Sequence, residues 1–177
     1  MKINNPAQIV SIGGILTTLA VLFQSLPVFL PGMGLIISPL ATLPIALAAV
    51  GSTNLGVISL FSSTLILLLI SPQEAVIFLF ATGLLGLMLG ASYNKRITQS
   101  IATATITLFI GINILIHIAG IAAFGDLTPD SSLITEAFII MLFSLIYSGM
   151  WIFILRFFVS IFKKTKHFSI FQSKQKE

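Results

Sequence analysis

The chain contains no cysteine and very little charge. Its 177 residues include no Cys, and only 8% are charged. The absence of cysteine excludes disulfides, thiol nucleophiles, cysteine-ligated zinc and iron–sulfur clusters. A soluble domain has about 25% charged residues, so this chain cannot cover itself with a polar surface. Water is therefore not its main solvent.

The sequence consists largely of long apolar runs. Hydrophobic residues make up 56% of the chain, and a run of about 18 or more such residues is typical of a transmembrane helix. A membrane β-barrel would show alternating apolar and polar residues, whereas stretches such as "LGVISLFSSTLILLLI" do not alternate. The sequence predicts an all-α integral membrane protein.

Turn-forming residues divide the apolar sequence into six predicted spans. The divisions are "PG" after Leu30, "GSTN" after Val50, "SPQE" after Ile70, "YNKRITQ" after Ser92 and "GDLTPD" after Phe124. We expect a six-helix transmembrane bundle that forms a single domain over residues 1–177. The predicted spans are 8–30, 33–52, 54–71, 73–93, 100–124 and 132–160.

The distribution of charge predicts how the bundle is oriented. With the N-terminus inside, all nine basic residues fall on the cytoplasmic side, and four of the five acids fall outside. The positive-inside rule favours this arrangement, so we expect a multi-pass protein with both termini cytoplasmic. The net charge of +4 then reflects orientation, and nucleic-acid binding is not expected. The basic cytoplasmic tail at 163–177 can either lie on anionic lipid or remain a solvated terminus.

Four of the seven prolines are concentrated in "LPVFLPGMGLIISPLATLP". Pro27 and Pro31 are at the predicted outer end of the first span, where the helix can end cheaply. Pro39 and Pro44 lie inside the second span, where each removes an intrahelical hydrogen bond and is expected to kink the helix. Transporters use such broken helices at binding sites. The prolines therefore favour an outer cavity.

Small residues at intervals of four occur in two spans. Residues with this spacing share one helix face and allow a neighbouring backbone to approach closely. They can serve packing inside the bundle or docking to another membrane protein. The fourth span is assigned to packing and the first to docking: Thr82, Gly86 and Gly90 in the fourth, and Gly13, Gly14, Thr17 and Thr18 in the first.

A few polar residues lie inside the apolar spans. Asn113 and His117 are four apart and so share a helix face, while Gln24 and Glu136 fall in the outer parts of their spans. Polar groups at such depth face the bundle interior or a cavity. The two interpretations are an interhelical hydrogen bond and a ligand contact. If all four converge on one outer cavity, they form a substrate-binding site.

Motifs for chemistry are missing from the sequence. No HExxH pair or P-loop is present, no GxS motif supports an intramembrane serine protease, and no two carboxylates share the interior of one span. The sequence therefore predicts neither an enzyme nor a metal or cofactor site.

This layout resembles a family of transport proteins. The segments "LPVFLPGMGLIISPLATLPIAL" and "ISPQEAVIFLFATGLLGLMLGASYNKR" look like those of the YybS-like predicted membrane proteins. That group is related to the substrate-binding S components of energy-coupling factor transporters. The resemblance covers residues 8 to about 125. It implies a subunit of a micronutrient importer in a prokaryotic cytoplasmic membrane. The subunit would work with partner proteins, namely ATPases and a transmembrane coupling protein.

The resemblance also assigns sites. S components carry an AxxxA-type docking patch in the first span, and the matching positions hold Gly13, Gly14, Thr17 and Thr18. The spacing is kept, but the alanines are not. A second group of similar general shape, the MreD-like cell-shape proteins, implies a non-transporting membrane scaffold. This chain lacks the acidic early spans associated with that group, which remains the alternative.

Overall fold

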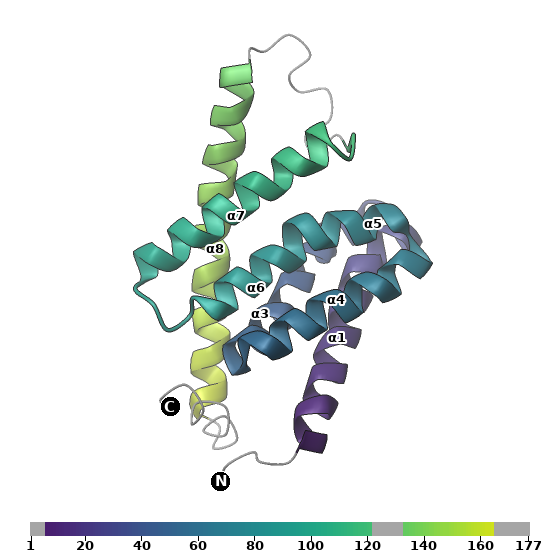
Figure 1. Cartoon of the computed structure of the whole chain (residues 1–177), viewed down its shortest axis with the longest axis vertical. Coiled ribbons are helices and arrows are strands. Elements are labelled where there is room, and N and C mark those ends of the chain that lie inside the picture. Colours follow the sequence, from purple (N-terminus) through teal and green to yellow (C-terminus); the bar gives the residue numbers. More distant parts are fainter. Residues whose placement is uncertain (1–5, 122–132, 165–177) are drawn as a thin grey trace.

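A computed structural model describes residues 6–121 and 133–164 of the chain (Figure 1). Within these ranges the regular structure is entirely helical, and no strand is present. The elements in chain order are α1 (Pro6–Phe29), α2 (Met33–Ile37), η1 (Ser38–Ala41), α3 (Thr42–Gly51), α4 (Thr53–Ile70), α5 (Pro72–Ile77), η2 (Phe78–Thr82), α6 (Gly83–Ala91), α7 (Ile97–His117) and α8 (Leu133–Lys164).

Six helical segments of the described chain are long and apolar enough to cross a membrane. The all-helical fold and the six long apolar segments predicted from the sequence are thereby confirmed within the described residues. The fifth segment differs most from its predicted limits, because α7 begins at Ile97 and ends at His117. The segments are Ile9–Phe29, Met33–Gly51, Thr53–Ile70, Pro72–Ala91, Ile97–His117 and Ile134–Ile161.

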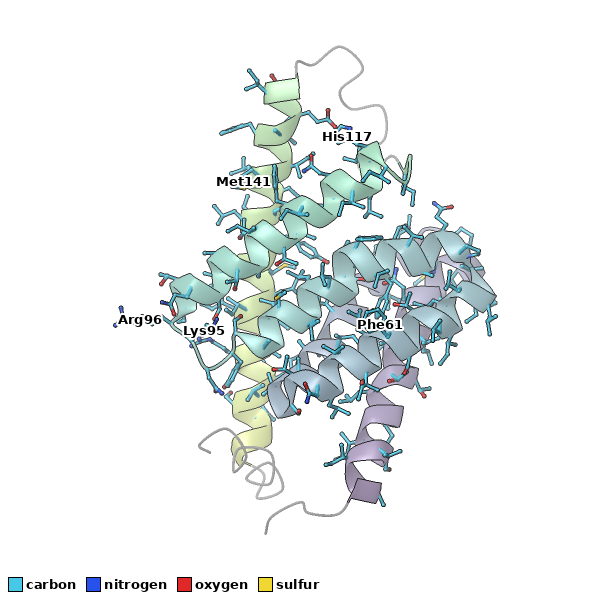
Figure 2. All side chains as sticks on the ribbon, in the orientation of Figure 1. Phe61, Lys95, Arg96, His117 and Met141 are labelled. Carbon is cyan, nitrogen blue, oxygen red and sulfur yellow. The ribbon has the colours of Figure 1, made fainter. Side chains whose placement is uncertain are left out.

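The helices form a bundle with α8 at its edge. Figure 1 shows α1, α3, α4 and α6 grouped together, with α7 crossing α8 beside α6. Helix α8 packs chiefly against α7 and also touches α3 and α6. The start of α1 and the end of α8 both lie towards the lower end of the view. In Figure 2, Lys95 and Arg96 lie at one end of α7 and His117 lies at the other.

The closest helix pair is α3 with α6, and glycines allow the approach. A Cβ atom on Gly86 would lie 2.5 Å from the carbonyl oxygen of Thr42. At Gly90 a Cβ atom would meet the backbone of Ala46 and the side chain of Ala49. Gly86 and Gly90 of the fourth span therefore face α3 and leave no room for a larger side chain there.

Two of the apolar segments contain irregular turns. In the second segment, the 3-10 helix η1 separates α2 from α3 and contains Pro39, whereas Pro44 lies inside α3. Pro39 cannot donate a hydrogen bond to the Leu35 carbonyl, and the Ser38 hydroxyl lies 3.5 Å from that oxygen in its place. The fourth segment contains the π-helix η2. The kink expected at these prolines stays a prediction.

The buried apolar side chains form two adjoining clusters. One lies among α3, α6, α7 and α8 and includes Leu85, Leu108 and Ile152. The other lies among α1, α3, α4 and the α5–η2 segment and includes Ile45, Leu67 and Phe78. Helix α3 contributes to both clusters, so its position fixes the relation between the two halves of the bundle.

Candidate functional site

A buried glutamine joins three separate elements of the fold. Gln24 of α1 is only 1% exposed. Its Nε2 donates to Oε2 of Glu74 at 2.8 Å, and its Oε1 accepts from Oγ1 of Thr82 at 2.8 Å. We call Gln24, Glu74 and Thr82 the Gln24 network. Because both ends of the amide are engaged, this side chain holds α1, α5 and η2 in a fixed relation.

The sequence at the start of α5 positions Glu74. Ser71 is the N-cap residue, and its side chain accepts a hydrogen bond from the backbone N–H of Glu74 at 3.4 Å. Pro72 occupies the first turn, where its missing N–H costs nothing. The Glu74 carboxylate thus lies beside the positive end of a helix dipole. This Ser-x-x-Glu pattern is a local signal that the helix begins here.

The third member of the network comes from an irregular turn. Thr82 is the last residue of the π-helix η2. Gly111 of α7 packs directly against the carbonyl group of Phe80 within that turn. The π-helix also contacts the 3-10 helix η1 of the second segment. π-Helical turns inside α-helices are frequent at functional sites, so the network borders the least regular part of the bundle.

The Glu74 carboxylate has capacity for a further partner. Its side chain is half-buried, and only Oε2 accepts a hydrogen bond from a described residue. None of the described basic residues forms an ion pair with it, and no group of three metal-ligating side chains occurs in the described ranges. The site can therefore accept a hydrogen bond or a positive charge at Oε1 from a bound molecule.

The other predicted substrate-binding residues are not hydrogen-bonded to the Gln24 network. Asn113 donates from Nδ2 to the Phe109 carbonyl of its own helix at 2.8 Å. His117 is exposed at the end of α7, as Figure 2 shows, and Glu136 is half-buried in the first turn of α8. Among the described residues, no hydrogen bond or ion pair joins these three to one another or to Gln24.

Sequence reasoning missed Glu74 as a partner of Gln24. The "SPQE" segment was assigned to a connecting turn, and Thr82 was assigned to packing. The Ser-x-x-Glu pattern gave the local signal that Glu74 begins a helix. No local signal showed that Gln24, 50 residues earlier, would meet it.

The predicted docking patch of the first span is divided between two faces of α1. Gly13 and Thr17 are buried against α4, where Leu55 packs on Gly13 and the Ser63 hydroxyl lies 3.4 Å from the Thr17 carbonyl. Gly14 and Thr18 are exposed, and Thr18 Oγ1 donates to the Gly14 carbonyl at 2.9 Å. Only the second pair remains on the outer surface of the bundle.

The described fold is all-helical, and its six long apolar helices are those of a protein that could cross a membrane several times. Comparison of the chain with protein-family models, curated proteins and solved structures finds no significant match.

Proposed function

We propose that the chain is the substrate-capture subunit of a prokaryotic importer, similar to the S components of energy-coupling factor transporters. The observation that supports this function is the Gln24 network. A buried amide holds one oxygen of a carboxylate and leaves the other without a described partner. A purely structural carboxylate in a membrane protein is expected to have its oxygens satisfied.

The turn between α1 and α2 is suited to act as a lid over this site. Gly32 has a φ angle of 86°, a left-handed conformation that favours glycine. Gly34 packs on the backbone of Leu26 and Pro27, so α2 lies directly against the end of α1 that carries Gln24. A ligand donor would bind Glu74 Oε1, and the turn would order over it.

Partners would supply the energy for release. With both termini cytoplasmic, the Gln24 network lies near the outer side of the membrane, where substrate arrives. The exposed Gly14–Thr18 face of α1 would meet a transmembrane coupling protein bound to ATPases. Micronutrient would then be released inside when the subunit reorients against that partner.

A thermal-shift screen tests this function. The purified chain in detergent is heated with each member of a panel of vitamins and related micronutrients. A ligand that binds only the folded chain raises the melting temperature by mass action. Glu74→Gln is expected to keep the fold, because Gln24 can donate to the new amide oxygen, and to lose the shift. The matched control Glu136→Gln is expected to keep it.

The absence of any shift across the panel would count against capture of micronutrients. A shift of equal size in Glu74→Gln would show that a ligand binds but not at the Gln24 network.

A membrane scaffold of the MreD-like kind is the second candidate. It is favoured by one observation, which is that Asn113 is satisfied within its own helix and His117 is exposed. Neither residue is hydrogen-bonded to Gln24. If the scaffold function holds, no small molecule changes the melting temperature, while bulky residues at Gly86 or Gly90 prevent assembly with partner proteins.

A further inference from the structure

Seven buried polar side-chain atoms of the described residues lack a hydrogen-bond partner, among them Ser59 Oγ on α4 and Thr105 Oγ1 on α7, and four of the seven lie near the middle of the second and sixth apolar segments. These four are Thr42 Oγ1, Ser144 Oγ, Ser148 Oγ and Trp151 Nε1. The exposed fraction is zero for Thr42, Ser144 and Ser148 and 2% for Trp151. A hydroxyl or indole N–H removed from water without a partner costs free energy. Four such groups therefore call for an explanation.

Several other helix hydroxyls of this chain behave differently, although those of Ser59 and Thr105 also lack a partner. Thr64 Oγ1 donates to the Leu60 carbonyl at 2.9 Å, Ser92 Oγ to the Met88 carbonyl at 2.6 Å and Thr107 Oγ1 to the Thr103 carbonyl at 2.8 Å. Each uses the carbonyl of the preceding turn, which is always within reach. The hydroxyls of Thr42, Ser144 and Ser148 make no such bond, so they are available to a partner outside their own helix.

Tyr147 brings the two helices of this cluster together. Its hydroxyl interacts with the side chains of Thr42 on α3 and Trp151 on α8, although neither polar group completes a hydrogen bond of good geometry. The Tyr147 and Trp151 rings meet edge to face, with centroids 6.2 Å apart. Ser144, Ser148 and Trp151 recur at intervals of four and three, which places them on one face of α8.

The cluster lies near the middle of its two membrane segments. Thr42 is near the centre of Met33–Gly51, and Ser144 and Ser148 are near the centre of Ile134–Ile161. Thr42 also follows the 3-10 helix η1 directly, and its backbone N–H points to the carbonyls of Pro39 and Leu40. In transporters, polar sites are built at this depth beside interrupted helices.

We propose that Thr42, Ser144, Tyr147, Ser148 and Trp151 form a second binding site, which takes a small neutral molecule bearing a carbonyl or amide group. The hydroxyls and the indole N–H donate to the carbonyl oxygen. The aromatic rings of Tyr147 and Trp151 provide apolar surface for the rest of the molecule. The five side chains carry no formal charge, so an ion would be bound poorly at this depth. This site is separate from the Gln24 network and does not depend on the function proposed for it.

Trp151 provides a direct readout, because it is the only tryptophan in the chain. The full chain in lipid nanodiscs is titrated with two neutral amide probes, acrylamide and nicotinamide, both of which quench tryptophan fluorescence. Iodide and nicotinate serve as charged counterparts. We expect saturable quenching by at least one amide probe. The charged counterparts are expected to quench at least fivefold more weakly at equal concentration.

Two variants and one control identify the source of the quenching. Thr42→Val and Ser148→Ala remove unpartnered hydroxyls at nearly constant volume and are expected to weaken the apparent affinity at least fivefold. Without a probe they should melt no lower than the wild-type chain, since they remove no hydrogen bond. Thr64→Val, which removes a hydroxyl bonded within α4, should leave the affinity unchanged.

Two results would overturn the proposal. Quenching by both amides that stays linear, with equal slopes in the wild-type chain and both variants, would mean that the cluster binds neither probe. A clear drop in melting temperature for both variants without a probe would mean that the hydroxyls are satisfied by structural water.

Discussion

At the scale of single residues, Gln24 joins three parts of the bundle through two side-chain hydrogen bonds. An amide at 1% exposure can be kept in a bundle surrounded by lipid only if both of its ends are satisfied. Glu74 and Thr82 meet that requirement from two other parts of the chain. Glu74 in turn is held by Gln24 and by the helix cap at Ser71, which leaves Oε1 as its remaining acceptor.

Gln24→Leu tests this role. The change removes two hydrogen bonds and leaves Glu74 and Thr82 without their shared partner, so the free energy of unfolding should fall by about 1–3 kcal/mol. Thermal unfolding in detergent micelles measures the loss. Gln73→Leu is the matched control, because Gln73 is exposed next to Glu74 and should change stability little. Equal effects of the two substitutions would contradict the proposed role of the network.

Asn113→Leu and His117→Leu are expected to be mild. Asn113 bonds only to its own helix, and His117 is exposed, so each change should alter the free energy of unfolding by less than about 0.5 kcal/mol. The same melting experiment checks this. A large loss in either variant would show that these residues hold the bundle together after all.

At the scale of elements, the contact of α3 with α6 decides whether the two halves of the bundle assemble. Both helices are apolar on all sides, so water does not select which faces meet. Close approach of the backbones at Gly86 and Gly90 supplies the selection through packing. The same contact positions Thr42, whose carbonyl oxygen lies against Gly86.

Gly86→Val should disrupt this contact. A Cβ atom there would lie 2.5 Å from the Thr42 carbonyl oxygen and 3.2 Å from Ile45 Cβ, and overpacking of this kind costs about 1–3 kcal/mol. Melting temperature and monodispersity in size-exclusion chromatography report the effect. The control is Gly149→Val, at a position with no atom within 4 Å of an added Cβ. If both variants elute and melt alike, the α3–α6 contact is not what holds the halves together.

The helical segments could be predicted from the sequence, but which face of each helix is buried could not. Apolar length and turn residues are local properties, so the sequence predicts six long apolar segments, and the described chain has six. Which side of α1 is buried depends on partners far along the chain. The row Gly13–Thr17 and the row Gly14–Thr18 look equivalent in sequence, yet one is buried against α4 and the other is exposed. The π-helix η2 likewise left no local signal.

At the scale of the whole molecule, the proposed function depends on which end of the bundle faces outward. Arg156 ties the lower part of α8 to the α6–α7 connection, since its Nη2 donates to the Lys95 carbonyl at 3.4 Å and its guanidinium lies 5.8 Å from the centre of the Tyr93 ring. Basic residues from α8 and from this connection thus gather at one end, and Glu74 lies in the first turn of α5. This separation of charge is what the positive-inside rule favours.

Introduced cysteines test the orientation without background labelling, because the chain has none of its own. Gln73→Cys and Thr98→Cys place a thiol at exposed positions near opposite ends of the bundle. A membrane-impermeant maleimide should label Gln73→Cys in intact cells and Thr98→Cys only after permeabilisation. The reverse pattern would put the Gln24 network on the cytoplasmic side and contradict capture from outside.

The central claim, that the Gln24 network captures a substrate, is tested most directly by what the chain carries when it is purified. Mass spectrometry of small molecules extracted from the affinity-purified protein should find one bound compound in near-stoichiometric amount. The compound should be present in the wild-type chain and in Glu136→Gln and absent from Glu74→Gln. A chain that carries no small molecule, or that carries it equally in Glu74→Gln, would contradict the account.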